Sequence, residues 1–155
     1  MVAYKNIGRS TPRLEGESKV TGGERYTGDL VLPDMLWGRA LRSPYPHARI
    51  THIDASGAQQ VPGVMAVLTG ADLRGVRYGR RLYDVPVLAE DEVRFVGERV
   101  AAVAAVDRDT AEEALLRIEV EYEELPAVYD PLDALEPGAP ILHPDVNSYT
   151  GLPRL

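Results

Sequence analysis

Three histidines are the side chains of this sequence with the clearest capacity to bind a metal ion, because imidazole nitrogen is a common ligand of transition metals. They are His47, His52 and His143. They form no i, i+4 pair on a helix, and no carboxylate lies at a recognisable ligand spacing. The sequence also has no cysteine, which excludes thiolate ligands, disulfides and thiol nucleophiles. We therefore expect no metal site in these residues.

A row of carboxylates in "EVEYEEL" could supply a general acid and a general base. Glu119, Glu121 and Glu123 recur at every second residue, which places them on one face of a β-strand. The same spacing is typical of the solvated face of a half-buried strand. Nothing in the sequence indicates the raised pKa that a carboxyl needs to donate a proton near neutral pH. We expect these side chains to face solvent.

The turn "DRDT", residues 107–110, stands between an apolar strand and a helix, where many proteins bind a phosphate. Such sites need glycines, so that the phosphate can approach the backbone N–H groups at the start of the helix. Here carboxylates occupy that position and would repel the phosphate. We expect Asp109 or Thr110 to cap the helix instead.

A basic and aromatic cluster lies in the stretch "RGVRYGRRLYD". It could dock an anionic partner surface, although surface loops often carry solvated arginines. The alternative interpretation is a surface loop with no binding role. The cluster consists of Arg74, Arg77, Tyr78, Arg80, Arg81 and Tyr83.

The serines offer no nucleophile, since neither Ser56 nor Ser148 stands in a G-x-S-x-G setting. No catalytic device is therefore recognisable. We expect no catalytic, cofactor-binding or metal-binding residue among residues 1–155.

Composition and charge limit the class of protein further. The 155 residues are 45% hydrophobic, which suffices for one globular domain with a core. The net charge of −7 argues against binding to nucleic acid. Residues 1–82 hold 12 Lys and Arg against 7 Asp and Glu, whereas residues 83–155 hold 5 against 17, so the two halves are expected to attract each other. No apolar run approaches the ~20 residues of a membrane span and no signal peptide is visible, so we expect a cytoplasmic protein.

The elements that position these residues can be predicted from periodicity. Residues 1–20 are polar and aperiodic, which indicates an arm, and Gly22-Gly23 predicts a hairpin turn. Residues 35–43 and 48–54 are expected to be strands, with Ile50 and Ile53 facing the core. Asp54 is expected to cap a helix over 55–60, followed by a buried strand over 64–69 and a capping contact between Thr69 and Asp72.

The stretch 93–106 predicts two strands on either side of Gly97, the second apolar on both faces. A helix follows, with Ala111, Ala114, Leu115 and Ile118 as its apolar stripe, and then a strand over 118–123. We expect the helix to cross over between strands of one sheet. Residues 131–135 predict one helical turn. The mixture of hairpins with few helices indicates an α+β fold.

Several strings in the sequence resemble one known family. They are "KVTGGERYTGDL", "LPDMLWGRALRSPYPHARI", "VPGVMAVLTGADL", "PVLAEDEVRFVGERVAAVAA" and "AEEALLRIEVEYEELPAV", and together they cover roughly residues 13–143. The family is the N-terminal α/β-hammerhead domain of the molybdopterin-binding large subunit of xanthine dehydrogenases, aldehyde oxidases and carbon monoxide dehydrogenases. Arg99 departs from it, because proline is usual there, and the loop 74–84 is idiosyncratic.

The resemblance implies a fold and a role. The fold would be an α/β-hammerhead, a mixed sheet with hairpins and one or two packed helices. Residues 1–20 would form an N-terminal arm, 21–143 the hammerhead domain, and 144–155 a linker toward molybdenum cofactor domains. "HPDVNSYTGLPRL" resembles such a linker, so we expect the polypeptide to continue; a separate small subunit is the alternative.

The implied function is that of a structural domain in a molybdenum hydroxylase that oxidises an aldehyde, an N-heterocycle or a related substrate. A molybdenum pyranopterin would be held by other domains of the subunit, with [2Fe-2S] clusters and FAD on partner subunits. The alternatives are a stand-alone carrier module modified at Lys19, since related folds present a lysine at a hairpin tip, and an isolated enzyme.

Overall fold

The apolar stretch "RVAAVAA" forms the central strand of a three-stranded antiparallel sheet. This strand, β7 (Arg99–Ala105), lies between β1 (Trp37–Arg42) and β3 (Val64–Thr69). Ala101 and Val103 are buried, whereas Ala102 and Ala104, which point to the opposite face, are less completely covered. A strand that is apolar on both faces is expected in the middle of a sheet, and this position is confirmed.

The computed structural model describes residues 8, 10–80 and 83–143. The chain divides into two compact units, Met1–Met35 and Leu36–Leu155. The first unit contains α1 (Gly16–Val20) and a 3-10 turn, η1 (Thr27–Asp29). Every other described element belongs to the second unit, including a last 3-10 turn, η2 (Asp133–Leu135), within the predicted helical turn.

A second antiparallel sheet has β2 (Ala48–Asp54) in the middle, between β6 (Glu92–Val93) and β8 (Glu119–Glu124). Ile50 pairs with Tyr122 and His52 with Glu121, so Thr51 is an extra residue that forms a bulge. Ile50 and Ile53 therefore both pack on the core, although they are an odd number of residues apart. Their predicted inward direction is confirmed.

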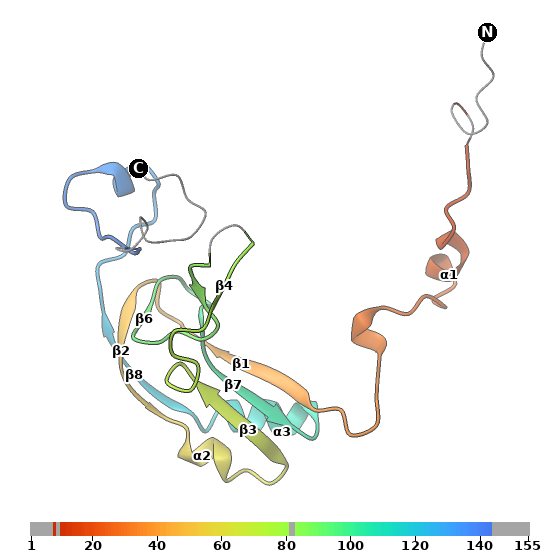
Figure 1. Cartoon of the computed structure of the whole chain (residues 1–155), viewed down its shortest axis with the longest axis horizontal. Coiled ribbons are helices and arrows are strands. Elements are labelled where there is room, and N and C mark those ends of the chain that lie inside the picture. The colour runs from red at the N-terminus through yellow and green to blue at the C-terminus, as the bar shows by residue number, and fades with distance from the viewer. Residues whose placement is uncertain (1–7, 9, 81–82, 144–155) are drawn as a thin grey trace. The chain divides into compact units, whose positions relative to one another are not determined.

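The helix after β7 connects the two sheets rather than two strands of one sheet. This helix, α3 (Arg108–Leu115), leaves the β1-β7-β3 sheet and leads to β8 in the β6-β2-β8 sheet (Figure 1). The strand, helix and strand were predicted at the right places, but the crossover within a single sheet was wrong. Periodicity identifies an element and its buried face, and it does not say which strand it pairs with.

Small side chains allow α3 to approach its neighbours closely. Ala111 and Ala114 are fully buried. Ala114 and Ala58 of α2 (Ser56–Gln59) belong to the cluster that covers one face of the β1-β7-β3 sheet. A second cluster lies around β2 and contains Ala48, Ala89, Val93 and Val100. Ile53 and Val120 contact both clusters and so join the two sheets.

The paired glycines near the N-terminus end a helix instead of forming a hairpin. Gly22 adopts a φ of +74°, and the N–H of Glu24 donates to the carbonyl of Ser18 at 3.0 Å. A left-handed glycine with a return hydrogen bond of this kind is typical of the end of an α-helix. The hairpin prediction was wrong because a hairpin turn and a helix end use the same positive φ.

Two further segments differ from the prediction. β3 lies at the edge of its sheet and exposes Met65 and Leu68, so it is not the buried strand that its apolar sequence indicated. The predicted loop 74–84 contains β4 (Arg77–Tyr78), which pairs with β5 (Val85–Pro86).

The predicted α+β class of the fold is nevertheless confirmed. Among the described residues, no helix has the length and apolar character that a membrane span requires.

We predict that Gly70→Ala destabilises the second unit, because an added Cβ would lie 2.0 Å from the carbonyl oxygen of Ala89. Relieving this overlap requires a backbone shift, which we expect to lower the free energy of unfolding by about 1–3 kcal/mol. Gly38→Ala is the matched control, since its added Cβ would meet no atom within 4 Å. Urea denaturation of both variants checks this, and equal midpoints would contradict it.

Candidate functional site

The turn before α3 caps the helix. Asp107 precedes the helix with extended backbone, and its Oδ1 accepts the N–H of Thr110 at 2.8 Å. This hydrogen bond lowers the pKa of the Asp107 carboxyl. The cap is therefore Asp107, and the expectation of Asp109 or Thr110 was wrong because the helix begins at Arg108. A carboxylate that already accepts this donor leaves no place for a phosphate.

The structure does not gather the histidines into a metal site. His47 is buried, and its Nδ1–H donates to the carbonyl of Pro126 at 2.6 Å. His52 is exposed on β2, and the charge of His143 acts on the carboxyl of Glu98. Within residues 8, 10–80 and 83–143, no three His, Asp or Glu side chains form a group that could hold a metal ion.

The carboxylates of β8 face solvent, as predicted. Glu119, Glu121 and Glu123 are exposed, whereas Val120 and Tyr122 pack inward. Glu123 forms an ion pair with Arg49 of β2 at 2.5 Å. The row is thus the solvated face of the strand.

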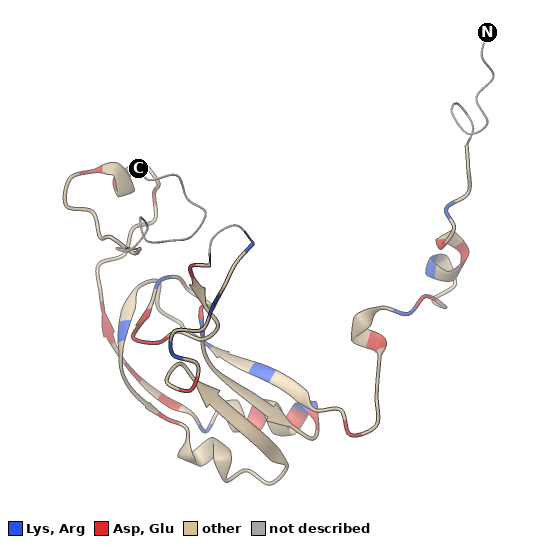
Figure 2. Ribbon diagram, in the orientation of Figure 1, with Lys and Arg blue, Asp and Glu red and all other residues tan. Residues whose placement is uncertain are grey.

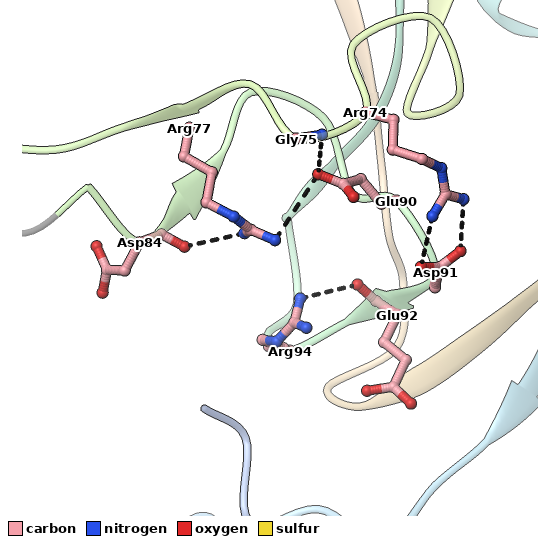
Figure 3. Close-up of polar contacts among 8 residues, drawn as sticks. All are labelled: Arg74, Gly75, Arg77, Asp84, Glu90, Asp91, Glu92 and Arg94. Carbon is pink, nitrogen blue, oxygen red and sulfur yellow. Dashed lines mark hydrogen bonds and ion pairs between the residues drawn. The ribbon is translucent and has the colours of Figure 1, made fainter. Parts of the chain in front are cut away.

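The arginines of the 74–84 segment mostly hold the segment itself in place. Arg74 donates two hydrogen bonds to the carboxylate of Asp91 in a bidentate contact, at 2.8 and 3.1 Å (Figure 3). Arg77 donates to the carbonyl of Asp84 and lies 3.9 Å from the carboxylate of Glu90, which also accepts the N–H of Gly75. The guanidinium of Arg74 lowers the pKa of the Asp91 carboxyl.

This arrangement argues against a large anion-binding patch, because acidic side chains already neutralise Arg74 and Arg77. Figure 2 shows basic and acidic residues interleaved around β4 and β5. Of the aromatic members of the cluster, Tyr78 accepts a hydrogen bond from Arg99, and Tyr83 is exposed.

Ion pairs also join the basic first half of the sequence to the acidic second half, as its charge asymmetry predicted. Such pairs in the described residues are Arg39–Glu112, Arg49–Glu123, Arg74–Asp91 and Arg77–Glu90.

Ser56, Thr69 and Asp72 take part in local turns. Arg81 and Ser148 lie outside the described residues. Ser56 donates its N–H to Asp54 at 2.8 Å, but the N-cap of α2 is Ala55, which forms no side-chain cap bond, so the predicted cap at Asp54 was one residue too early. Asp72 accepts both the N–H and the hydroxyl of Thr69, which is the predicted capping contact.

Glu98 is a buried carboxyl that the sequence analysis did not identify. It is 6% exposed, and its Oε2 accepts the N–H of Arg94 at 2.5 Å, which closes the tight turn before β7. Burial raises the pKa of Glu98, and the N–H and charge of Arg94, with the charges of His143 and Arg99, oppose that rise. The only sequence signal was a single carboxyl inside the largely apolar run "RFVGERVAAV". Its contacts are those of a residue that fixes a turn.

A hollow among the described residues lies on the less covered face of the β1-β7-β3 sheet. It has a volume of about 590 Å³. We call it the sheet groove; its floor is made by Gly38, Ala40, Ala66, Leu68, Ala102 and Ala104, and Arg42 and Arg99 also line it. The floor carries no side-chain donor or acceptor, so it can receive apolar surface but cannot perform proton transfer.

Comparison with known proteins identifies the type of domain. Residues 21–126 match the family described as the a/b hammerhead domain of aldehyde oxidase and xanthine dehydrogenase. The chain therefore belongs to this family, as its sequence motifs indicated, and the hammerhead fold is confirmed. Lys19, the residue on which the carrier alternative depended, lies in α1 and pairs with Glu15 at 3.2 Å, not at a hairpin tip.

Particular relatives are similar over most of the chain. A probable xanthine dehydrogenase subunit of Bacillus subtilis (strain 168) is 48% identical over 139 residues, which cover 89% of this chain and 19% of that protein. The nicotinate dehydrogenase large molybdopterin subunit of Eubacterium barkeri is 39% identical, with 93% of this chain and 34% of that protein covered. A crystal structure of the Cu,Mo-CO dehydrogenase superimposes with a TM-score of 0.83 and 42% identity, over 90% of this chain and 18% of that one. The chain thus spans about a fifth to a third of the length of these proteins.

We predict that Asp107→Ala lowers the melting temperature, because the first turn of α3 loses the acceptor for the N–H of Thr110. Asp109→Asn is the control, since Asp109 lies inside the helix and is not its cap. Thermal unfolding followed by circular dichroism should show a clearly larger decrease for Asp107→Ala. If the Asp109 variant were the less stable of the two, the assignment of the cap would be wrong.

We predict that Glu98→Gln changes the pH dependence of stability. A carboxyl whose pKa is raised by folding binds its proton more tightly in the folded state, so its contribution to stability falls as pH rises from its unfolded pKa through the folded value. The amide of glutamine does not titrate and can still accept the N–H of Arg94. The variant should therefore gain stability relative to the unsubstituted chain as pH rises above about 4. Urea midpoints that differ by a constant amount between acidic and neutral pH would refute the assignment.

Proposed function

We propose that this chain is a structural domain of the large subunit of a molybdenum hydroxylase. It packs on the cofactor-binding part of the same polypeptide and helps to form the contact with electron-transfer partners. Relatives that share 39–48% of its residues are named for xanthine, nicotinate and carbon monoxide. A segment so similar among enzymes named for such different substrates is a poor candidate for selecting the substrate, and this observation carries the proposal.

The side chains of the described residues do not fit a molybdenum pyranopterin. The floor of the sheet groove is apolar, the polar side chains that line the groove are arginines, which offer the pterin ring no acceptor, and the turn before α3 is acidic. Buried Glu98 is committed to the N–H of Arg94. We therefore assign the pyranopterin to other domains of the subunit, and derive no catalytic step from these residues.

The partners follow from the same proposal. Iron-sulfur subunits, and in some complexes an FAD subunit, would receive the electrons, and the assembled enzyme would oxidise an aldehyde, an N-heterocycle or a related substrate in the cytoplasm. Residues 21–143 would form the hammerhead domain, with residues 1–20 as an arm and 144–155 as the connection to the cofactor domains. Residues 144–155 lie outside those that the structure describes.

We predict that the 155-residue chain purified from cells that make the pyranopterin contains neither molybdenum nor pterin, because it lacks a fitting set of ligands. The full-length large subunit that carries the same residues should contain both. Metal analysis by mass spectrometry and fluorescence of oxidised pterin check this on the two proteins side by side. Stoichiometric cofactor on the 155-residue chain would overturn the structural role, and a full-length subunit without cofactor would overturn the assignment to a molybdenum hydroxylase.

A further inference from the structure

The side chains on the floor of the sheet groove are unusually small. In the register of the sheet, Gly38 and Ala66 lie on either side of Ala104, and Ala40 and Leu68 lie on either side of Ala102. Four of the five neighbours of Leu68 on this face thus have a single methyl group, and the fifth has only hydrogen. No side chain among these five rises to fill the space above the floor, so a second structural element can lie directly on the strands.

The opposite face of the same sheet is already covered. Ala101 and Val103 belong to the buried cluster with Ala114 of α3, and α3 lies behind the strands in Figure 1. The groove face has no such helix among the described residues of the second unit, and Leu68 remains 40% exposed. A sheet with one covered and one uncovered apolar face has a docking surface on the second.

Two arginines give the groove a charged end. A register shift makes Val100 an extra residue of β7, so that Arg42 of β1 pairs directly with Arg99. Arg42 donates to the carbonyl of Gly97 at 2.7 Å, and Arg99 donates to Tyr78 and lies over its ring, 5.3 Å from the centroid.

Neither of these guanidiniums has a carboxylate within 4.0 Å in the part of the chain that the structure describes. Arg39, on the same strand as Arg42, pairs with Glu112 of α3 at 3.1 Å. Two adjacent guanidiniums with spare donors fit a carboxylate from an element laid along the groove.

We infer that the sheet groove is occupied by a segment of the same large-subunit polypeptide that lies outside residues 1–155. This segment is apolar where it crosses the floor, and it carries an Asp or Glu that meets Arg42 and Arg99. The inference rests on the proposed function. About four fifths of the Bacillus relative lies outside the matched region, so the polypeptide has ample length to supply the segment. A groove of this size offers little contact area, so a free peptide would bind it weakly. A segment of the same chain binds it more readily, because the covalent connection gives the segment a high effective concentration.

The test places a photoreactive side chain, p-benzoylphenylalanine, at Leu68 in the full-length large subunit within its assembled complex. Met65 is the matched control, because it lies on the same strand, is 63% exposed and does not line the groove. After irradiation and digestion, mass spectrometry should find Leu68 joined to a large-subunit peptide outside residues 1–155. The Met65 sample should lack that peptide. A product with residues 1–35, with a second copy or with another subunit, or no product from Leu68, would overturn the inference.

A charge exchange tests the arginine end. Arg42→Glu in the full-length subunit should lower the melting temperature, and replacing the acidic residue of the crosslinked peptide by Arg in the same protein should restore it. Arg25→Glu, in the first unit, is a control that the second replacement should not rescue. An unchanged melting temperature, or equal rescue of both variants, would contradict the pairing. Molybdenum content of the same preparations separates the two proposals, since cofactor without the crosslink contradicts only the groove.

Discussion

The close contact of α3 with the β1-β7-β3 sheet is the interaction on which the second unit depends. It is made largely of small side chains, with Ala111 and Ala114 on the helix and Ala101 and Val103 on the strand. Small side chains bury little area each, so stability must come from the short distance between the backbones. Gly57 serves the same purpose at the edge of this contact, because a Cβ there would lie 2.8 Å from the carbonyl oxygen of Arg117. Larger residues at these positions would separate the elements.

Three register shifts adapt the strands to this geometry. The extra residue is Val100 in β7, Thr51 in β2 and Met65 in β3. Each shift reverses the alternation of the strand in which it falls, and therefore changes which side chains meet the core. At Thr51 it turns both Ile50 and Ile53 inward. The shift at Val100 directs its side chain into the hydrophobic cluster around β2. The neighbouring Arg99 then lies on the groove face of the sheet. The pairing of the two arginines at the end of the groove is thus a product of one bulge.

The sequence alone predicted the elements better than their connections. A continuous apolar run located β7 and an alternation of apolar and acidic residues located β8, because burial of two faces or of one imposes its own pattern. Neither pattern indicates which strands pair, so α3 was placed between strands of one sheet. Its cap was assigned to Asp109 or Thr110 instead of Asp107, since all three are residue types that cap helices well. The sequence could not predict the burial of Glu98 or the small side chains on the floor of the groove. Both features arise only when strands distant in sequence come into register. The family motifs predicted the hammerhead fold because resemblance to a family whose fold is known also indicates which strands pair.

Several polar contacts of the second unit fix turns or loops. Arg74 with Asp91, Asp107 with Thr110 and Glu98 with Arg94 each fix a turn or a loop, and the ion pairs lie at least partly in solvent, where they contribute little to stability. Charge therefore defines the positions of loops, while apolar contacts hold the sheets together. Arg42 and Arg99 differ, since they stand beside an apolar floor and form no ion pair with the described residues. A surface that combines a floor of methyl groups with spare guanidinium donors suits the apolar, carboxylate-bearing segment that we infer to occupy it.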